Sequence, residues 1–308
     1  MNKLKKVGLT ALATTLVASS AYAGEMSVSG SASLNYSGIS TSSDVNPWTM
    51  GDSVTFSGGG DLDNGMTVGV SYELDGGNYD DYKLTLGLGD GMGTVTFSGN
   101  SVNAGGVDMV KDIVPTAYTA VYENTNAVDN GIAAGIGGRN TSSMWGYKNS
   151  VGDLTVSLGY NAINSTAAAN AAEGSIGLSY DMDGIQLVAG RFDDGDVAVH
   201  DTVGAKYTAG SISAAIQRSD INYDGTTNDQ EAMHMGVSFA VNESLSVSVG
   251  RQTVEIDGAV DDEINQGISA SYTMGSITIG GAFNEVNSAG GAAGTDVEAT
   301  ILNLAFAF

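Results

Sequence analysis

The sequence has 308 residues, of which 44 are Gly, two are Pro and none is Cys. Asp and Glu total 35 against 11 Lys and Arg, which gives a formal net charge of −24. A chain of this charge repels phosphate backbones, so we expect no nucleic-acid partner. The lack of Cys excludes disulfide scaffolds, thiolate metal sites and thiol catalysis.

Residues 1–23 have the layout of a secretory signal peptide. Lys3, Lys5 and Lys6 form a basic start, an apolar stretch follows, and the segment ends in the small-residue motif Ala21-Tyr22-Ala23. The alternative is a membrane-anchoring helix, but the apolar stretch is much shorter than the roughly 20 residues that span a bilayer. We therefore expect cleavage after Ala23 and a mature domain over residues 24–308. The mature domain would be exported from the cytoplasm.

Period-two alternation dominates the chain after residue 24. One phase of each run is apolar or aromatic, and the other consists mainly of Ser, Thr, Gly and Asn. Such alternation is typical of half-buried β-strands. It predicts an all-β chain of about sixteen antiparallel strands over residues 25–37, 53–60, 66–74, 79–88, 93–99, 142–148, 153–161, 173–180, 184–192, 201–208, 211–218, 231–240, 244–252, 263–272, 276–284 and 296–308.

The links between these strands alternate in length. One set is tight and rich in Gly, Asn and Asp, as in 89–91, 181–183 and 209–210, which is the chemistry of hairpin turns. The other set is mostly longer and acidic, with 75–78 as a short exception, and 100–141 is far longer than the rest. Short turns at one rim and long loops at the other are typical of a transmembrane antiparallel β-barrel.

The apolar phase could face a dry core or lipid. A soluble barrel or sandwich would usually expose Lys, Glu and Arg, whereas the polar phase here is small and uncharged. Sixteen strands also enclose a space too wide for side chains to fill. Aromatic residues close many runs and would form two interfacial girdles. These features favour apolar residues facing lipid and small polar residues facing a water-filled lumen.

Taken together, the alternating opening strand EMSVSGSASLNYSG, the tight turns, the long third loop and the terminal ILNLAFAF ending on Phe308 resemble the Gram-negative general-diffusion porins, the sixteen-stranded trimeric outer-membrane porins. The resemblance implies a periplasmic amino terminus, a homotrimer embedded in the bilayer with lipopolysaccharide, and a third loop folded into the pore as a constriction. The link 75–78 departs from the family pattern, because it is too short to reach a neighbouring subunit.

Segment 100–141 gathers charged residues within a long interruption of the strand pattern. A link of this length is usually functional or disordered. Folded into the lumen as the resemblance implies, it would narrow the pore where the electrostatic field is strongest. The alternative is a solvated surface loop. The candidate constriction residues are Asp108, Lys111, Asp112, Glu123, Asp129 and Arg139.

The polar phase of the strands offers a second group of ionisable residues. Lys83, between Tyr82 and Leu84, must face water if those neighbours face lipid, and the same reasoning applies to the others. Basic wall groups opposite an acidic loop would create a transverse field, although simple solvation in the lumen is the alternative. These candidate pore-wall residues are Lys83, Lys148, Lys206, Glu73 and His234.

Arg191, Arg218 and Arg251 break the pattern, because they occupy the apolar phase near the outer ends of their strands. A lipid-facing Arg costs about 2–4 kcal/mol at the centre of a bilayer but close to nothing at its interface. Two hypotheses remain open. The arginines either lie at the outer rim and pair with lipid phosphates, or a β-bulge turns them into the pore.

Two acidic clusters occur in external loops. Their carboxylates could bind Ca²⁺ or Mg²⁺, which prefer oxygen ligands, but the spacing is not that of an EF-hand and solvated loops are the alternative. The clusters are Asp193, Asp194 and Asp196, and Asp261, Asp262 and Glu263. Beyond these ions we expect no cofactor. No spacing indicates a catalytic constellation, so we predict that the protein is not an enzyme.

The sequence therefore predicts a passive outer-membrane channel for small hydrophilic solutes and ions, with a preference for cations that follows from the excess of carboxylates. The alternative function is a non-conducting adhesin or structural barrel that acts through its acidic external loops. A secreted calcium-dependent β-solenoid is a third possibility, but the tandem glycine-aspartate repeats expected of it are missing.

Overall fold

The computed structural model describes residues 26–41, 46–99, 105–123, 144–162, 172–195, 197–225 and 227–308. These residues contain sixteen strands, as the alternation predicts. The strands are β1 (Ser27–Ile39), β2 (Trp48–Asp61), β3 (Thr67–Asp75), β4 (Asn78–Gly87), β5 (Thr94–Gly99), β6 (Met144–Val151), β7 (Leu154–Asn161), β8 (Glu173–Met182), β9 (Ile185–Asp193), β10 (Ala198–Ala209), β11 (Ile212–Tyr223), β12 (Gln230–Ala240), β13 (Leu245–Ile256), β14 (Glu263–Met274), β15 (Ile277–Asn287) and β16 (Val297–Ala307).

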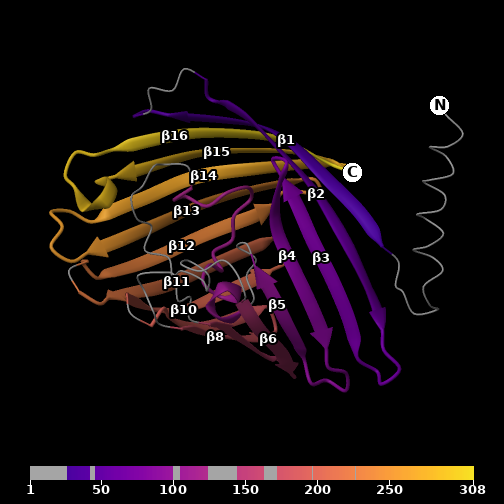
Figure 1. Ribbon diagram of the computed structural model, residues 1–308. Helices are drawn as coiled ribbons and strands as arrows, with labels where there is room; N and C mark the ends of the chain where they lie inside the picture. The colour runs from indigo at the N-terminus through magenta and orange to yellow at the C-terminus, as the bar shows by residue number, and fades with distance from the viewer. Residues whose placement is uncertain are drawn as a thin grey trace, which may run out of the picture.

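The strands form one closed antiparallel barrel (Figure 1). Each strand pairs with its neighbours in sequence, and β1 pairs with β16 to close the sheet. At this seam Gly30 N donates to Phe308 O at 2.7 Å, and Phe308 N donates to Gly30 O at 2.9 Å. Closure leaves no unpaired sheet edge. Two short 3₁₀ helices, η1 (Gly106–Met109) and η2 (Ala289–Gly291), lie in links between strands.

Across the described ranges, no helix has both the length and the apolar character needed to cross a bilayer.

The apolar phase of the strands faces outward. On β12, Met235, Val237 and Phe239 are 40–44% exposed, whereas His234, which precedes Met235 in the opposite phase, is 2% exposed. The same alternation follows the other strands of this side of the barrel, where Val249 is 55% and Ile268 is 60% exposed. A soluble barrel or sandwich would bury these side chains, so the structure contradicts that alternative.

The two rims of the barrel differ in their connections, as the link lengths predict. The rim joined by tight hairpins is called the turn end here, and the opposite rim the loop end. The two-residue turn between β8 and β9 places Asp183 at φ 46° and Gly184 at φ 84°. The link between β3 and β4 is an equally tight turn at the loop end, with Gly76 and Gly77 at positive φ. The wall is therefore lower at this point of the loop end.

Strand β2 begins five residues before its predicted start. Its outward phase reads Trp48, Met50, Asp52, Val54, so a carboxylate interrupts the apolar pattern without interrupting the pairing with β1. Strands β10, β11 and β13 also continue past their predicted ends at the loop end. Backbone pairing thus extends beyond the stretch where lipid-facing residues are apolar.

The β8–β9 turn generates a test of the hairpin assignment. A Cβ at Gly184 would lie 2.6 Å from the carbonyl oxygen of Thr208, whereas a Cβ at Gly210, also at positive φ, meets nothing within 4 Å. Both Ala variants adopt a left-handed conformation that costs about 1–2 kcal/mol. We expect Gly184→Ala to lower the free energy of unfolding by at least about 1 kcal/mol more than Gly210→Ala, because only the former adds overpacking.

Urea unfolding in lipid vesicles, followed by the fluorescence of Trp48 and Trp145, measures this difference. Equal losses in the two variants would show that the close approach of the Thr208 carbonyl has no energetic consequence.

Candidate functional site

The described part of the long third link lies inside the barrel. Residues 105–123, called the strap here, leave the wall after β5 and run along the inner faces of β7 to β15 (Figure 1). The parts of the predicted loop at 100–104 and 124–141, including Asp129 and Arg139, lie outside the described residues. The prediction that the third loop folds into the barrel is thus confirmed for the strap.

Serine side chains of the wall bind the backbone of the strap at its start and again beyond its middle. Gly106 N donates to Ser157 Oγ at 2.7 Å and Val107 N donates to Ser175 Oγ at 2.6 Å. Further along, Ala117 N donates to Ser248 Oγ at 2.9 Å. Buried backbone donors need such partners because a lost hydrogen bond costs about 1–3 kcal/mol. The serines of the inner phase therefore accept hydrogen bonds from the strap backbone as well as lining the lumen.

Two larger amides of the wall hold the middle and the end of the strap. Gln217 on β11 accepts from Ile113 N and donates to Val110 O, both at 2.8 Å. Asn284 on β15 donates to Ala120 O at 2.9 Å and to Glu123 O at 3.1 Å. Both side chains are at most 2% exposed. Sequence reasoning missed them, although a Gln or Asn in a phase of small residues is a usable signal.

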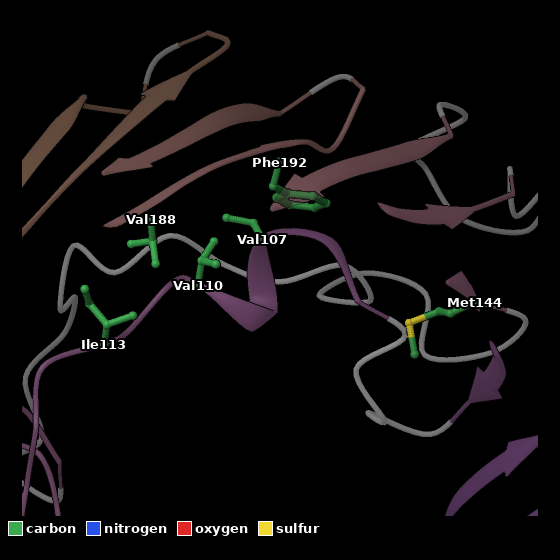
Figure 2. Close-up of a cluster of buried hydrophobic side chains, with 6 residues drawn as sticks. All are labelled: Val107, Val110, Ile113, Met144, Val188 and Phe192. Carbon is green, nitrogen blue, oxygen red and sulfur yellow. The ribbon is translucent and has the colours of Figure 1, made fainter. Parts of the chain in front are cut away.

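Glycines of the inner phase make room for the apolar side chains of the strap. A Cβ at Gly190 would lie 2.7 Å from Val107 Cγ2 and 2.8 Å from Val110 Cγ2, and one at Gly204 would lie 2.9 Å from Ile113 Cδ1. Figure 2 shows Val107, Val110 and Ile113 beside side chains of β9. These glycines continue along the strap as a glycine track, which consists of Gly177, Gly190, Gly204, Gly236 and Gly250.

The buried apolar cluster of the protein lies along this track. Val107, Val110 and Ile113 of the strap pack with Val188 and Phe192 of β9, and Met144 at the start of β6 completes the cluster (Figure 2). All six side chains are at most 8% exposed. Hydrophobic burial therefore reinforces the hydrogen bonds that attach the strap to the wall.

Asp112 is held in place by two aromatic neighbours. The Tyr122 hydroxyl donates to Asp112 Oδ2, and His234 Nδ1 lies 3.7 Å from Asp112 Oδ1. The Tyr122 and His234 rings meet edge to face with centroids 5.6 Å apart. Burial raises the pKa of Tyr122, and the Asp112 carboxylate raises it further, so the phenol stays a donor at neutral pH. The Asp112 side chain remains 25% exposed to the lumen.

The other charges of the strap differ in their surroundings. Lys111 Nζ lies 2.8 Å from Asp108 Oδ1, and the Asp108 side chain is 2% exposed. This pair is close to neutral as a unit. The side chain of Glu123 is exposed. Of the predicted constriction residues, the strap therefore presents Asp112 and Glu123 to the lumen as carboxylates without a Lys or Arg within 4 Å among the described residues.

The predicted pore-wall residues share the inner face with the strap contacts. Lys148 lies opposite Ser157, Lys206 is two residues from Gly204, and Lys83 lies opposite Ser98, which is 0% exposed. Glu73 lies two residues along β3 from Ser71, the partner of Lys83. His234 lies against the strap itself.

The predicted transverse arrangement of lysines opposite the loop is wrong for Lys206, which stands on the wall that carries the strap. Lys148 is on β6, next to the first strand that the strap contacts. Only Lys83 is on a strand remote from the strap. The alternation predicts that a residue faces the lumen, but it does not predict whether its strand lies beside the strap or across the lumen from it. That distinction requires the closed barrel.

The three arginines are on the outer face and the strand registers around them are continuous. The bulge hypothesis is therefore wrong, since the register shift in the barrel lies between β3 and β4. Arg191 Nη1 lies 3.1 Å from Asp201 Oδ2. Arg218 Nη2 lies 2.9 Å from Asp220 Oδ1 and 2.8 Å from Glu231 Oε2.

Arg251 differs from these two, because its guanidinium contacts only the amide oxygen of Gln266, at 3.3 Å, among the described residues. Carboxylates of this chain therefore occupy the positions predicted for lipid phosphates at Arg191 and Arg218. Pairing of Arg251 with a lipid phosphate stays a prediction.

The described residues of the two acidic loop clusters do not gather into an ion site. Asp193 and Asp194 accept backbone hydrogen bonds from Gly195 and from Val197 and Ala198, which stabilises their own turn. Asp196 lies outside the described residues. In the part of the chain that the structure describes, no group of three or more His, Asp or Glu side chains could hold a metal ion.

Glu263 separates from its cluster, because it is 0% exposed whereas Asp261 and Asp262 are exposed. It accepts hydrogen bonds from Asn265 and from Gly290 N, each at 2.8 Å. The carboxylate therefore fastens the η2 loop to β14. The prediction that grouped Glu263 with a loop cation site is wrong, because Glu263 begins β14 with a buried carboxylate that is already hydrogen-bonded, whereas Asp261 and Asp262 lie exposed in the link before the strand.

The glycine track generates the second test. Gly190→Val places a branched side chain where Val107 and Val110 pack, and overpacking of this kind costs about 1–3 kcal/mol. We expect amide hydrogen exchange in residues 105–123 to accelerate by roughly tenfold or more, because an opening free energy lower by 1.4 kcal/mol corresponds to tenfold. Mass spectrometry of the folded protein in detergent measures the exchange.

Gly174→Val is the matched control, since a Cβ at Gly174 meets nothing within 4 Å. Exchange in the strap that is equally fast in both variants, or unchanged in both, would contradict the role assigned to the track.

Comparison with known proteins agrees with this architecture. A solved porin structure superposes with a TM-score of 0.71 at 16% identity, covering 92% of this chain and 100% of that chain. OmpT, an outer membrane protein of Vibrio cholerae, gives 0.69 at 11% identity and covers 92% and 98%. Salmonella typhi OmpF, solved in complex with daunomycin, gives 0.66 at 14% identity and covers 92% and 98%. At these identities the likenesses establish the fold.

The sequence itself identifies the family. No curated protein sequence matches the chain. The sequence model of the Gram-negative porins, however, matches residues 8–308, which is nearly the whole chain. With a closed sixteen-stranded barrel, an apolar outer face and an interior strap, the chain belongs to the Gram-negative porin family.

Proposed function

We propose that the protein is a passive channel through which small hydrophilic solutes and ions cross the outer membrane, with a preference for cations. Family membership supports an outer-membrane diffusion channel. Three finer expectations from the sequence belong to the same proposal. They are export with cleavage after Ala23, a periplasmic amino terminus and assembly as a homotrimer in a bilayer that contains lipopolysaccharide.

The observation that carries the cation preference is the charge that the strap turns toward the lumen. Asp108 and Lys111 neutralise each other at 2.8 Å, whereas Asp112 and Glu123 have no Lys or Arg within 4 Å in the part of the chain that the structure describes. Carboxylates at the narrow part of a channel raise the local concentration of cations and repel anions. Tyr122 fixes Asp112 as an acceptor, which keeps one Asp112 oxygen oriented while the side chain stays partly exposed.

The selectivity is tested by reversal potentials across a KCl gradient in planar bilayers. The wild-type protein should pass K⁺ in preference to Cl⁻. We expect Asp112→Asn to lower the permeability ratio by roughly twofold or more, since one charge a few ångströms from an ion in water contributes about 1 kcal/mol. Asp63→Asn, in an exposed turn between β2 and β3, is the control that removes one charge without touching the strap.

Anion preference in the wild-type protein would contradict the proposed selectivity. If Asp112→Asn and Asp63→Asn had the same permeability ratio of K⁺ to Cl⁻, the Asp112 carboxylate would not determine the selectivity.

The conductance tests the strap as the constriction. Replacing residues 105–123 by a short Gly-Ser linker should raise the single-channel conductance, because the strap occupies part of the lumen. Heat-modifiable migration in electrophoresis checks that the barrel folds. A folded wild-type barrel without any conductance would favour the alternative of a non-conducting adhesin or structural barrel.

A further inference from the structure

The ring of Tyr118 on the strap lies flat against the inner face of β15. A Cβ added at Gly280 would lie 2.2, 2.5 and 2.7 Å from Cδ2, Cε2 and Cγ of that ring, so the face of the ring covers the glycine. The strap backbone is fixed at this point, because Tyr118 N donates to Ser269 Oγ at 3.1 Å. The side chain of Tyr118 is only partly buried. One face of the ring therefore packs on β15 and the other is turned toward the lumen.

A row of hydrogen-bonded polar side chains begins beside this ring. Asn303 on β16 is the register partner of Gly280, and Asn35 on β1 is the register partner of Asn303. Asn303 Nδ2 donates to Asn35 Oδ1, and Asn35 Nδ2 donates to Ser33 Oγ at 3.1 Å. Asn303, Asn35 and Ser33 are called the amide row here, and all three are partly exposed. An amide has two N–H donors, so each Asn keeps one N–H for a solute.

The strands that carry the amide row present no charge to the lumen. Strand β1 contains no charged residue, and the one on β16, Glu298, is in the outward phase. On the strap, Asp112 lies against His234 of β12, three strands from β15, and the Glu123 backbone is bound by Asn284, four residues along β15 from Gly280. A charged solute would lose water beside the amide row without gaining an opposite charge, whereas a neutral solute avoids this cost.

We propose that the Tyr118 ring and the amide row form a binding site for the rings of neutral carbohydrates. The inference rests on the proposed diffusion channel and names a solute class for it. The C–H face of a pyranose ring stacks on the lumen face of Tyr118. The sugar hydroxyls, each of them both donor and acceptor, bond to the amide row. Because a channel must release its solute, we expect a dissociation constant in the millimolar range.

Saturation-transfer NMR of the folded full-length barrel in detergent tests the site without requiring ion flow. The protein is titrated with glucose and, separately, with sorbitol, which offers similar hydroxyls but has no ring to stack. We expect glucose to bind roughly fivefold more tightly than sorbitol, which is the effect of one aromatic stacking contact.

Variants separate the two parts of the site. Tyr118→Ala removes the stacking face and Asn303→Ala removes an amide, and each should weaken glucose binding by roughly fivefold. Tyr118→Phe keeps the ring and should retain most of the affinity. Asn303 is on the wall and not on the strap, so its variant tests the site even where the loss of Tyr118 loosens the strap. Gln186→Ala is the matched control, because it removes an amide from the inner phase of β9, remote from β15.

Glucose that does not bind saturably, equal affinity for glucose and sorbitol, or an unchanged glucose affinity in either Tyr118→Ala or Asn303→Ala would overturn the proposal. Ion-current recordings keep this outcome apart from the proposed function. A channel that conducts K⁺ but binds no glucose would refute the site alone. A barrel that binds glucose without conducting would refute the channel and leave the site. Heat-modifiable migration verifies that each variant is folded.

Discussion

The pairing of every backbone polar group within the membrane is the constraint on which this structure depends. Hydrocarbon offers no hydrogen bonds, so an open sheet edge would cost several kcal/mol per unpaired group, and the sheet must close. The seam between β1 and β16, sealed at Gly30 and Phe308, achieves this. Closure with sixteen strands then fixes an outside that must be apolar and an inside too wide for side chains to fill.

The strap occupies part of that interior and depends on the chemistry of the wall. Serine hydroxyls and the amides of Gln217 and Asn284 satisfy its backbone, and the glycine track receives its valines and isoleucine. Because these contacts lie on β7 to β15, the wall residues there act as a binding surface for the chain itself. The polar residues of β1 to β4 have no such role in the described structure. Within the strap, the Tyr122 hydroxyl orients the Asp112 carboxylate. The attachment of the strap to the wall therefore also decides where this negative charge lies.

The alternation in the sequence predicted all sixteen strands, because a two-residue period is a local property. Strand ends were less predictable where charge enters the lipid-facing phase, as at Asp52 on β2 and beyond Arg218 on β11. The position of the strap inside the barrel was predicted from the length of the link and a family resemblance, but its contacts with the wall were not. Gly190 and Gly204 look like ordinary lumen residues until the barrel places them beneath Val107 and Ile113. The carboxylate partners of Arg191 and Arg218 likewise depend on register between strands.

The direction in which the two phases face is the central claim. Nitroxide labels at positions 235, 237 and 238 of β12, in protein reconstituted into vesicles, report it through collisions with oxygen, which concentrates in hydrocarbon, and with a nickel chelate, which stays in water. At Met235 and Val237 oxygen collisions should dominate, and at Ser238 nickel collisions should dominate; Gly236 stays unlabelled, because a side chain there would displace the strap. The reversed pattern, or no alternation along the strand, would contradict the account.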